Sequence, residues 1–123
     1  MTFQYNLNYI GGISGYNKRA VYTLKIKDDC FFVNGLIKSK KFSYNQINKI
    51  IFGTTDELKG RIIEVNDLLF NHVKLLDYRL NRKLRYCLVI VLKDTTIIFA
   101  EEHDVNIKNA YQRLNKVYLS TKK

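Results

Sequence analysis

Hydrophobic and polar residues alternate along much of this chain, and that pattern predicts short strands. The clearest case runs over 18–27, where Tyr22, Leu24 and Ile26 point to one side. Lys25 and Lys27 fall on the other side, together with Val21 and Thr23. Because successive side chains of a strand point to opposite faces, this segment is expected to be a half-buried strand.

Further strands are predicted at 30–33, 36–42, 47–52, 61–65, 84–92 and 96–100. Asn34-Gly35 favours a tight two-residue hairpin turn, since both central positions of that turn prefer positive φ. Strand 84–92 is apolar on both faces, so both sides should be covered, by a helix, by the segment 66–80 or by another subunit. The strands before residue 54 form an antiparallel meander.

The period of the pattern changes near the C-terminus, where 104–119 is predicted to be an α-helix. Its apolar residues recur at steps of three and four: Ile107, Ala110, Tyr111, Leu114, Val117 and Tyr118. Asp104 is expected to be the N-cap, because its carboxylate can accept from the free amides of the first turn. A helix of this length is marginal alone in water, so its apolar stripe must pack on the strands.

These elements predict a single domain over 1–123, mainly β with a C-terminal α-helix. Residues 1–17 are expected to be a polar lead-in whose glycines form a turn before the first strand, and 54–83 an irregular insertion, helical or extended at 66–80. The expected architecture is a bent antiparallel sheet or barrel of about seven strands, capped by helix 104–119.

Charge says more about partners than about fold. The chain carries 21 Lys and Arg against 11 Asp and Glu, a formal net charge of +10, so its surface should attract acidic objects. Cys30 and Cys87 lie in apolar runs and are expected to be buried, reduced thiols. With neither a signal peptide nor an apolar span in the sequence, we expect a cytoplasmic protein, free or peripheral at the inner membrane face.

No constellation of catalytic or metal-binding residues stands out. The two histidines have no ligand partners at useful spacing, and the adjacent acidic pairs, such as Asp28-Asp29, lie at turns or strand ends. The glycines at 11–15 are not followed by the Gly-Lys-Ser/Thr of a phosphate-binding loop. We therefore expect no enzymatic activity and no cofactor.

The chain resembles the bacterial PH-like (pleckstrin-homology-like) domains. Members often open with Tyr-hydrophobic-Gly-Gly, as in Tyr9-Ile10-Gly11-Gly12 here, and carry an Arg-rich apolar insertion, to which 61–85 is similar. Their hydrophobic-Pro-aromatic-x-x-Ile-x-x-Ile stretch corresponds to 42–50, except that Ser43 stands where the pattern usually has Pro. The resemblance implies the capped seven-strand layout and a binding module rather than an enzyme. Asp28-Asp29, in the loop where PH domains bind inositol phosphates, would repel a phosphorylated head group.

The leading hypothesis is a non-catalytic module that binds an acidic protein surface. The expected contact residues are basic clusters and one apolar anchor beside them: Lys38, Lys40, Lys41, Phe70, Lys74, Arg79, Arg82, Lys83 and Arg85. Three alternatives stay open: nucleic-acid or nucleoprotein binding, including a small phage or mobile-element inhibitor; attachment to anionic membrane; and a homo-oligomer formed through strand 84–92.

Overall fold

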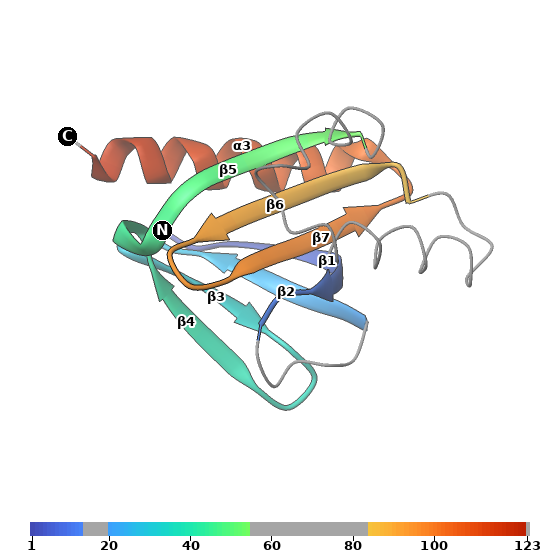
Figure 1. Ribbon diagram of the computed structural model, residues 1–123, viewed down its shortest axis with the longest axis horizontal. Coiled ribbons are helices and arrows are strands. Elements are labelled where there is room, and N and C mark those ends of the chain that lie inside the picture. The colour runs from blue at the N-terminus through green and yellow to red at the C-terminus, as the bar shows by residue number, and fades with distance from the viewer. Residues whose placement is uncertain (14–19, 55–83, 123) are drawn as a thin grey trace.

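The protein folds as one antiparallel sheet and a C-terminal helix (Figure 1). The computed structural model describes residues 1–13, 20–54 and 84–122. Seven strands pair in the order β4-β3-β2-β1-β7-β6-β5. This confirms the predicted fold class. The elements are β1 (Phe3–Gly11), β2 (Ala20–Ile26), β3 (Cys30–Asn34), β4 (Ser39–Ser43), the 3-10 turn η1 (Tyr44–Gln46), β5 (Ile47–Thr54), β6 (Tyr86–Leu92), β7 (Thr96–Glu101) and α3 (Asp104–Thr121).

The central strand of the sheet, β1, lies in the segment that we expected to be a polar lead-in, so that prediction is wrong. β1 pairs with β2 on one side and with β7 on the other. Leu7 and Tyr9 are buried, and the alternate positions Gln4, Asn6 and Asn8 are polar. Asparagine and glutamine are poor strand formers, so the alternation of apolar and polar residues along β1 did not predict a strand. The expected strand at 61–65 lies outside the described residues, as does most of the predicted insertion.

Strand order requires the sheet to bend. β4 and β5 stand at opposite edges of the sheet, yet η1 alone connects them. The two edges must therefore approach each other at this corner. Among the described residues no pairing joins β4 to β5, so the sheet is open there. A capping box holds η1: the Ser43 backbone N–H donates to Gln46 Oε1 at 2.8 Å, which fixes where the chain turns.

One face of the sheet packs on α3. Ile107, Ala110, Leu114 and Tyr118 of the helix are buried against residues from both halves of the sheet, among them Leu24. The predicted apolar stripe is thus confirmed, with Tyr111 and Val117 half-buried at its margin. The N-cap prediction is wrong. His103 takes that position without a side-chain hydrogen bond, and Asp104 is the first helical residue.

A second apolar cluster lies apart from the helix and contains Ile10, Ile51, Leu84, Cys87, Val89, Ile98 and Ala100. β6 contributes to both clusters, Leu88 and Ile90 to the helix side and Cys87 and Val89 to the other. This confirms that β6 is apolar on both faces and that α3 covers one of them. Both cysteines are buried thiols that form no disulfide, as expected.

Gly12 marks the point where β1 separates from β7. Its φ is 122°, and a Cβ there would stand 1.7 Å from the Thr96 carbonyl oxygen. The Thr95 hydroxyl donates to the Gly12 carbonyl oxygen and so ties this point to the β6–β7 turn. Only glycine allows this close approach of two backbones.

The β3–β4 hairpin is longer than predicted. Its turn spans residues 35–38, and the Gly35 N–H donates to the Lys38 carbonyl oxygen at 2.7 Å. Among the described glycines only Gly12 has positive φ, so Gly35 does not adopt the predicted tight turn. Leu36 and Ile37 were expected to begin a strand, but they occupy the tip of the hairpin and are 71% and 96% exposed. β4 starts at Ser39.

Candidate functional site

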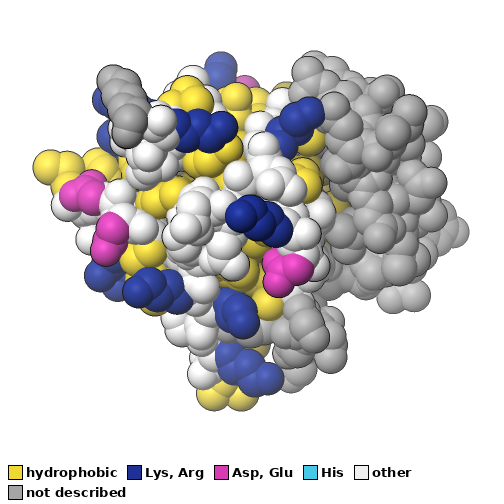
Figure 2. Space-filling model, turned by 60° about the vertical axis from the view of Figure 1, so that its left-hand side comes forward, with side chains coloured by type: hydrophobic (Ala, Val, Ile, Leu, Met, Phe, Trp, Pro, Cys, Tyr) yellow, Lys and Arg dark blue, Asp and Glu magenta, His cyan; other side chains and the backbone are white. Residues whose placement is uncertain are grey.

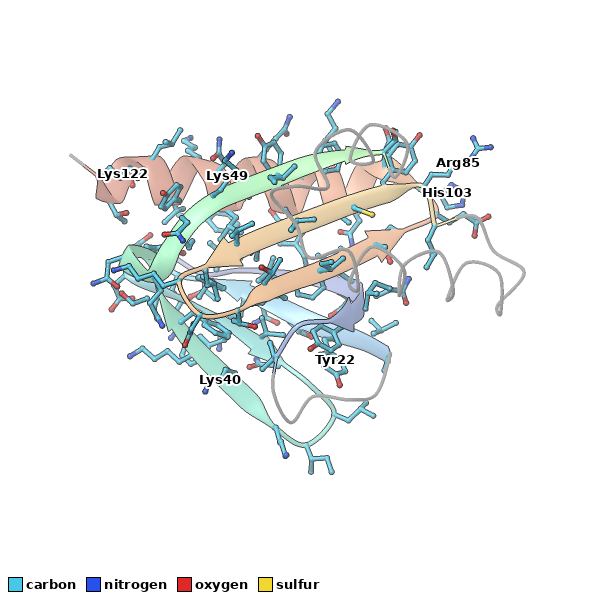
Figure 3. The ribbon with its side chains drawn as sticks, in the orientation of Figure 1. Tyr22, Lys40, Lys49, Arg85, His103 and Lys122 are labelled. Carbon is cyan, nitrogen blue, oxygen red and sulfur yellow. The ribbon has the colours of Figure 1, made fainter. Side chains whose placement is uncertain are left out.

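The predicted contact residues do not form one surface among the described residues. Lys38, Lys40 and Lys41 are exposed on the β3–β4 hairpin. Arg85 is exposed just before β6, and Figure 3 shows it at the opposite end of the molecule from Lys40. Five predicted residues lie outside the described part of the chain: Phe70, Lys74, Arg79, Arg82 and Lys83. Of the predicted contact residues, only the hairpin lysines lie close together in the described part of the chain.

Strand register places two more basic residues beside this hairpin. Lys25 of β2 lies opposite Phe32 of β3, which lies opposite Lys41 of β4. The neighbours Phe31 and Val33 are fully buried, so Phe32 and its two partners project from the outer face of the sheet. A row of lysine, phenylalanine and lysine thus crosses three adjacent strands.

A third lysine joins this row from the end of β2. The Lys27 ammonium lies 5.7 Å from the centroid of the Phe32 ring, within the range of a cation–π contact. Phe32 is half-buried, so part of its ring faces solvent. We call the surface formed by Lys25, Lys27, Phe32 and Lys41 the basic face.

Among the described residues no carboxylate pairs directly with the lysines of this face. Within the described residues the one ion pair is exposed and joins the N-terminal amine to Asp28 at 3.1 Å, so no described carboxylate lies within 4.0 Å of the basic-face lysines. Asp29, next along the turn, hydrogen-bonds the Cys30 thiol. Figure 2 shows Lys and Arg side chains spread over one side of the molecule with few Asp or Glu between them. The lysine charges are therefore left to attract anions from solution.

A polar hollow of about 500 Å³ lies beside η1, between the start of β5 and the end of α3. Its phenols support the fold: Tyr44 donates to the Lys27 carbonyl oxygen at 2.6 Å, and Tyr118 donates to the Ile47 carbonyl oxygen at 3.3 Å. Burial raises the pKa of Tyr44 well above its usual range, and nearby Cys30 adds to the effect. Tyr44 therefore keeps its proton at neutral pH and is suited to holding the η1 corner.

Sequence reasoning recognised that Lys25 and Lys27 point outward, but it did not assign them or Phe32 to the site. The missing information was the register between β3 and β4. A two-residue turn at Asn34-Gly35 would place Ile37 opposite Phe32. In the structure the partner of Phe32 is Lys41, and this pairing creates the basic face.

In the part of the chain that the structure describes, no group of three or more His, Cys, Asp or Glu residues could hold a metal ion. The described helices include none with the length and apolar character needed to cross a bilayer. Comparison with known proteins found no match to this chain among protein-family models, curated proteins or solved structures.

Proposed function

We propose that this protein is a non-catalytic binding module that recognises an acidic protein partner through its basic face. One observation carries the proposal: three lysines surround a half-exposed phenylalanine, and no described carboxylate pairs with them. An aromatic side chain ringed by charge is a typical arrangement at protein interfaces. Unpaired lysines on a rigid sheet would also speed the approach of an acidic partner.

Membership of the PH-like family is part of this proposal. It is supported by the strand order, by the η1 corner between β4 and β5 and by the single helix after β7. Such a scaffold would present the basic face while α3 closes the core on the other side of the sheet. We also propose that the protein is cytoplasmic and meets its acidic partner there.

Nucleic acid fits the basic face less well than a protein does. Binding of single strands relies on aromatic rings that stack on bases. Here many rings are used inside the core: Tyr9 stacks on Tyr22 at 4.6 Å, and Phe31 stacks on Phe42 at 5.2 Å. On the basic face only Phe32 remains to offer a ring, and one partly covered ring provides little stacking.

The proposal is tested by affinity capture from a bacterial lysate, with and without nuclease treatment, at about physiological salt. The wild-type protein is compared with a variant that reverses three charges of the basic face, Lys25→Glu, Lys27→Glu and Lys41→Glu. We expect the wild type to retain a protein in stoichiometric amount and the variant to lose it. Capture that is equal for both proteins, or capture of nucleic acid alone before nuclease treatment, contradicts the proposal.

The matched control carries the same change in net charge on other exposed surfaces. It combines the substitutions Lys108→Glu, Lys116→Glu and Lys122→Glu, all at exposed positions on or directly after α3, which packs on the other face of the sheet. If recognition depends on the basic face, this control keeps the partner. If it loses the partner as fully as the first variant does, net charge is responsible and the basic face is not a site.

Membrane attachment is a second candidate because of the hairpin tip. Leu36 and Ile37 are adjacent, strongly exposed and apolar, and Lys38 follows them directly. Apolar side chains beside lysines can insert at the boundary between head groups and acyl chains. If this candidate is right, Ile37→Glu abolishes sedimentation with phosphatidylserine vesicles, and the unsubstituted protein does not sediment with phosphatidylcholine vesicles.

A further inference from the structure

β4 is an edge strand whose outer backbone groups can be identified from the register. It pairs only with β3, within the described residues. Residues of an antiparallel pair alternate between those bonded to the neighbouring strand and those pointing away from it. Because Gly35 bonds to Lys38, residues 38, 40 and 42 bond toward β3, and residues 39, 41 and 43 point outward.

Two further contacts agree with this assignment. The Ser43 N–H, which should point outward, donates to Gln46 Oε1 and not to β3. The Ser39 hydroxyl donates to the side chain of Asn34 directly opposite, and side chains approach most closely at such a non-hydrogen-bonded pair. With Ser43 capped by Gln46, the open stretch of the edge is formed by the backbone of Ser39 and Lys41.

Charge determines what this edge can accept. Lys40 and Lys41 are exposed on β4, and lysines on an edge strand repel a second copy of the same edge. The same charges attract an acidic chain. On the outer side of the sheet Lys41 also continues the row formed by Lys25 and Phe32, so acidic side chains of an added strand would extend that row.

We propose that the β4 edge binds an acidic extended segment of the partner, which pairs with Ser39 and Lys41 as an additional strand of the sheet. This rests on the function proposed above and specifies how the partner docks. A partner residue opposite Lys41 exchanges both of its backbone hydrogen bonds with Lys41, and its own side chain and those two positions away present carboxylates to the basic face. Backbone pairing supplies affinity, and the lysines select an acidic sequence.

Fluorescence anisotropy with a short labelled peptide of alternating glutamate and threonine tests the proposal. Two variants of one residue are compared. Lys41→Pro removes the lysine and the outward N–H, whereas Lys41→Ala removes the lysine alone. Proline is tolerated on an edge strand where the N–H faces solvent, so both variants should fold. We expect the proline variant to bind the peptide about five- to tenfold more weakly than the alanine variant, as expected for the loss of one backbone hydrogen bond.

A second peptide keeps the test decisive if the proline variant does not fold. It has the same sequence with alternate backbone nitrogens methylated, so its charge is unchanged but its ability to pair as a strand is lost. We expect wild-type protein to bind the unmodified peptide about tenfold more tightly than this one. Failure of both peptides to bind wild-type protein at low salt overturns the proposed edge pairing.

The two proposals can fail separately. If both peptides bind equally and the triple charge reversal abolishes binding, an acidic partner is recognised by charge without strand pairing, and only the edge proposal falls. If the triple reversal leaves peptide binding and the captured partner unchanged, the basic face is not a site and the proposed function falls as well.

Discussion

Two groups beside the turn between β2 and β3, Cys30 at the start of β3 and Tyr44 of η1, have a titration that is coupled to folding. The Cys30 thiol is buried, and its pKa is raised above 9.0, first by burial and then by a hydrogen bond to Asp29. Burial likewise raises the pKa of Tyr44 above 10.0, with further contributions from Cys30 and the two aspartates of this turn. The acidic turn therefore helps to keep both neighbours protonated.

The free energy of unfolding should fall at alkaline pH. Because both pKa values are higher in the folded state, the unfolded chain releases these protons first. The stabilising effect is complete below the unfolded pKa values and is lost as pH rises toward the folded ones. Each group that ionises only when unfolded removes about 1.4 kcal/mol per pH unit. Urea denaturation between about pH 8 and pH 11 measures the slope.

Cys30→Ala supplies the control for this pH dependence. The part of the slope that begins near pH 9.0 should disappear in the variant, while the part due to Tyr44, beginning near pH 10.0, should remain. A wild-type curve that stays flat up to about pH 11 would show that neither group titrates differently in the folded and unfolded states.

At the scale of single elements, the sequence was informative about faces and poor at register. The helical stripe of α3 and the alternating faces of β2 and β6 could be predicted, because burial depends on local periodicity. The β3–β4 register could not be predicted, because it depends on the turn at 35–38, where Gly35 does not have positive φ. β1 was missed because its polar positions are filled by poor strand formers.

Packing of α3 on the sheet should dominate the stability of the helix. Leu114 is fully buried in the main core, whereas Leu119 of the same helix is 52% exposed. We expect Leu114→Ala to lower the free energy of unfolding by about 2–5 kcal/mol, because it leaves a cavity. Leu119→Ala should change it by about 0.5 kcal/mol or less. Similar losses for the two variants in urea denaturation would contradict the observed helix orientation.

On the scale of the whole molecule, the excess positive charge lowers stability as well as being the proposed means of recognition. The net charge is +10, and among the described residues the one ion pair joins the N-terminal amine to Asp28 and involves no lysine or arginine. Repulsion between lysines such as Lys40 and Lys41 therefore outweighs attraction on the described surface. If the surface lysines bind an acidic partner as proposed, they destabilise the isolated protein while no partner is bound.

Moderate salt should stabilise the free protein. Raising sodium chloride from about 10 to about 150 mM shortens the Debye length from about 30 to about 8 Å and screens these repulsions. We expect the free energy of unfolding to rise by about 0.5–1 kcal/mol, the range typical of surface charge contacts. Lys40→Gln combined with Lys41→Gln should reduce this effect. Loss of stability on adding salt would show that attractive pairs dominate.

The central place of β1 also affects how the protein is made. β1 leaves the ribosome before every other strand, yet one of its two neighbours, β7, does not begin until Thr96. β2, β3 and β4 can join β1 early, but until β7 emerges the nascent sheet keeps an unpaired side along its central strand. A ribosome that pauses before Thr96 thus exposes the unpaired backbone edge of β1, and we expect chaperones to be needed most during that interval of translation.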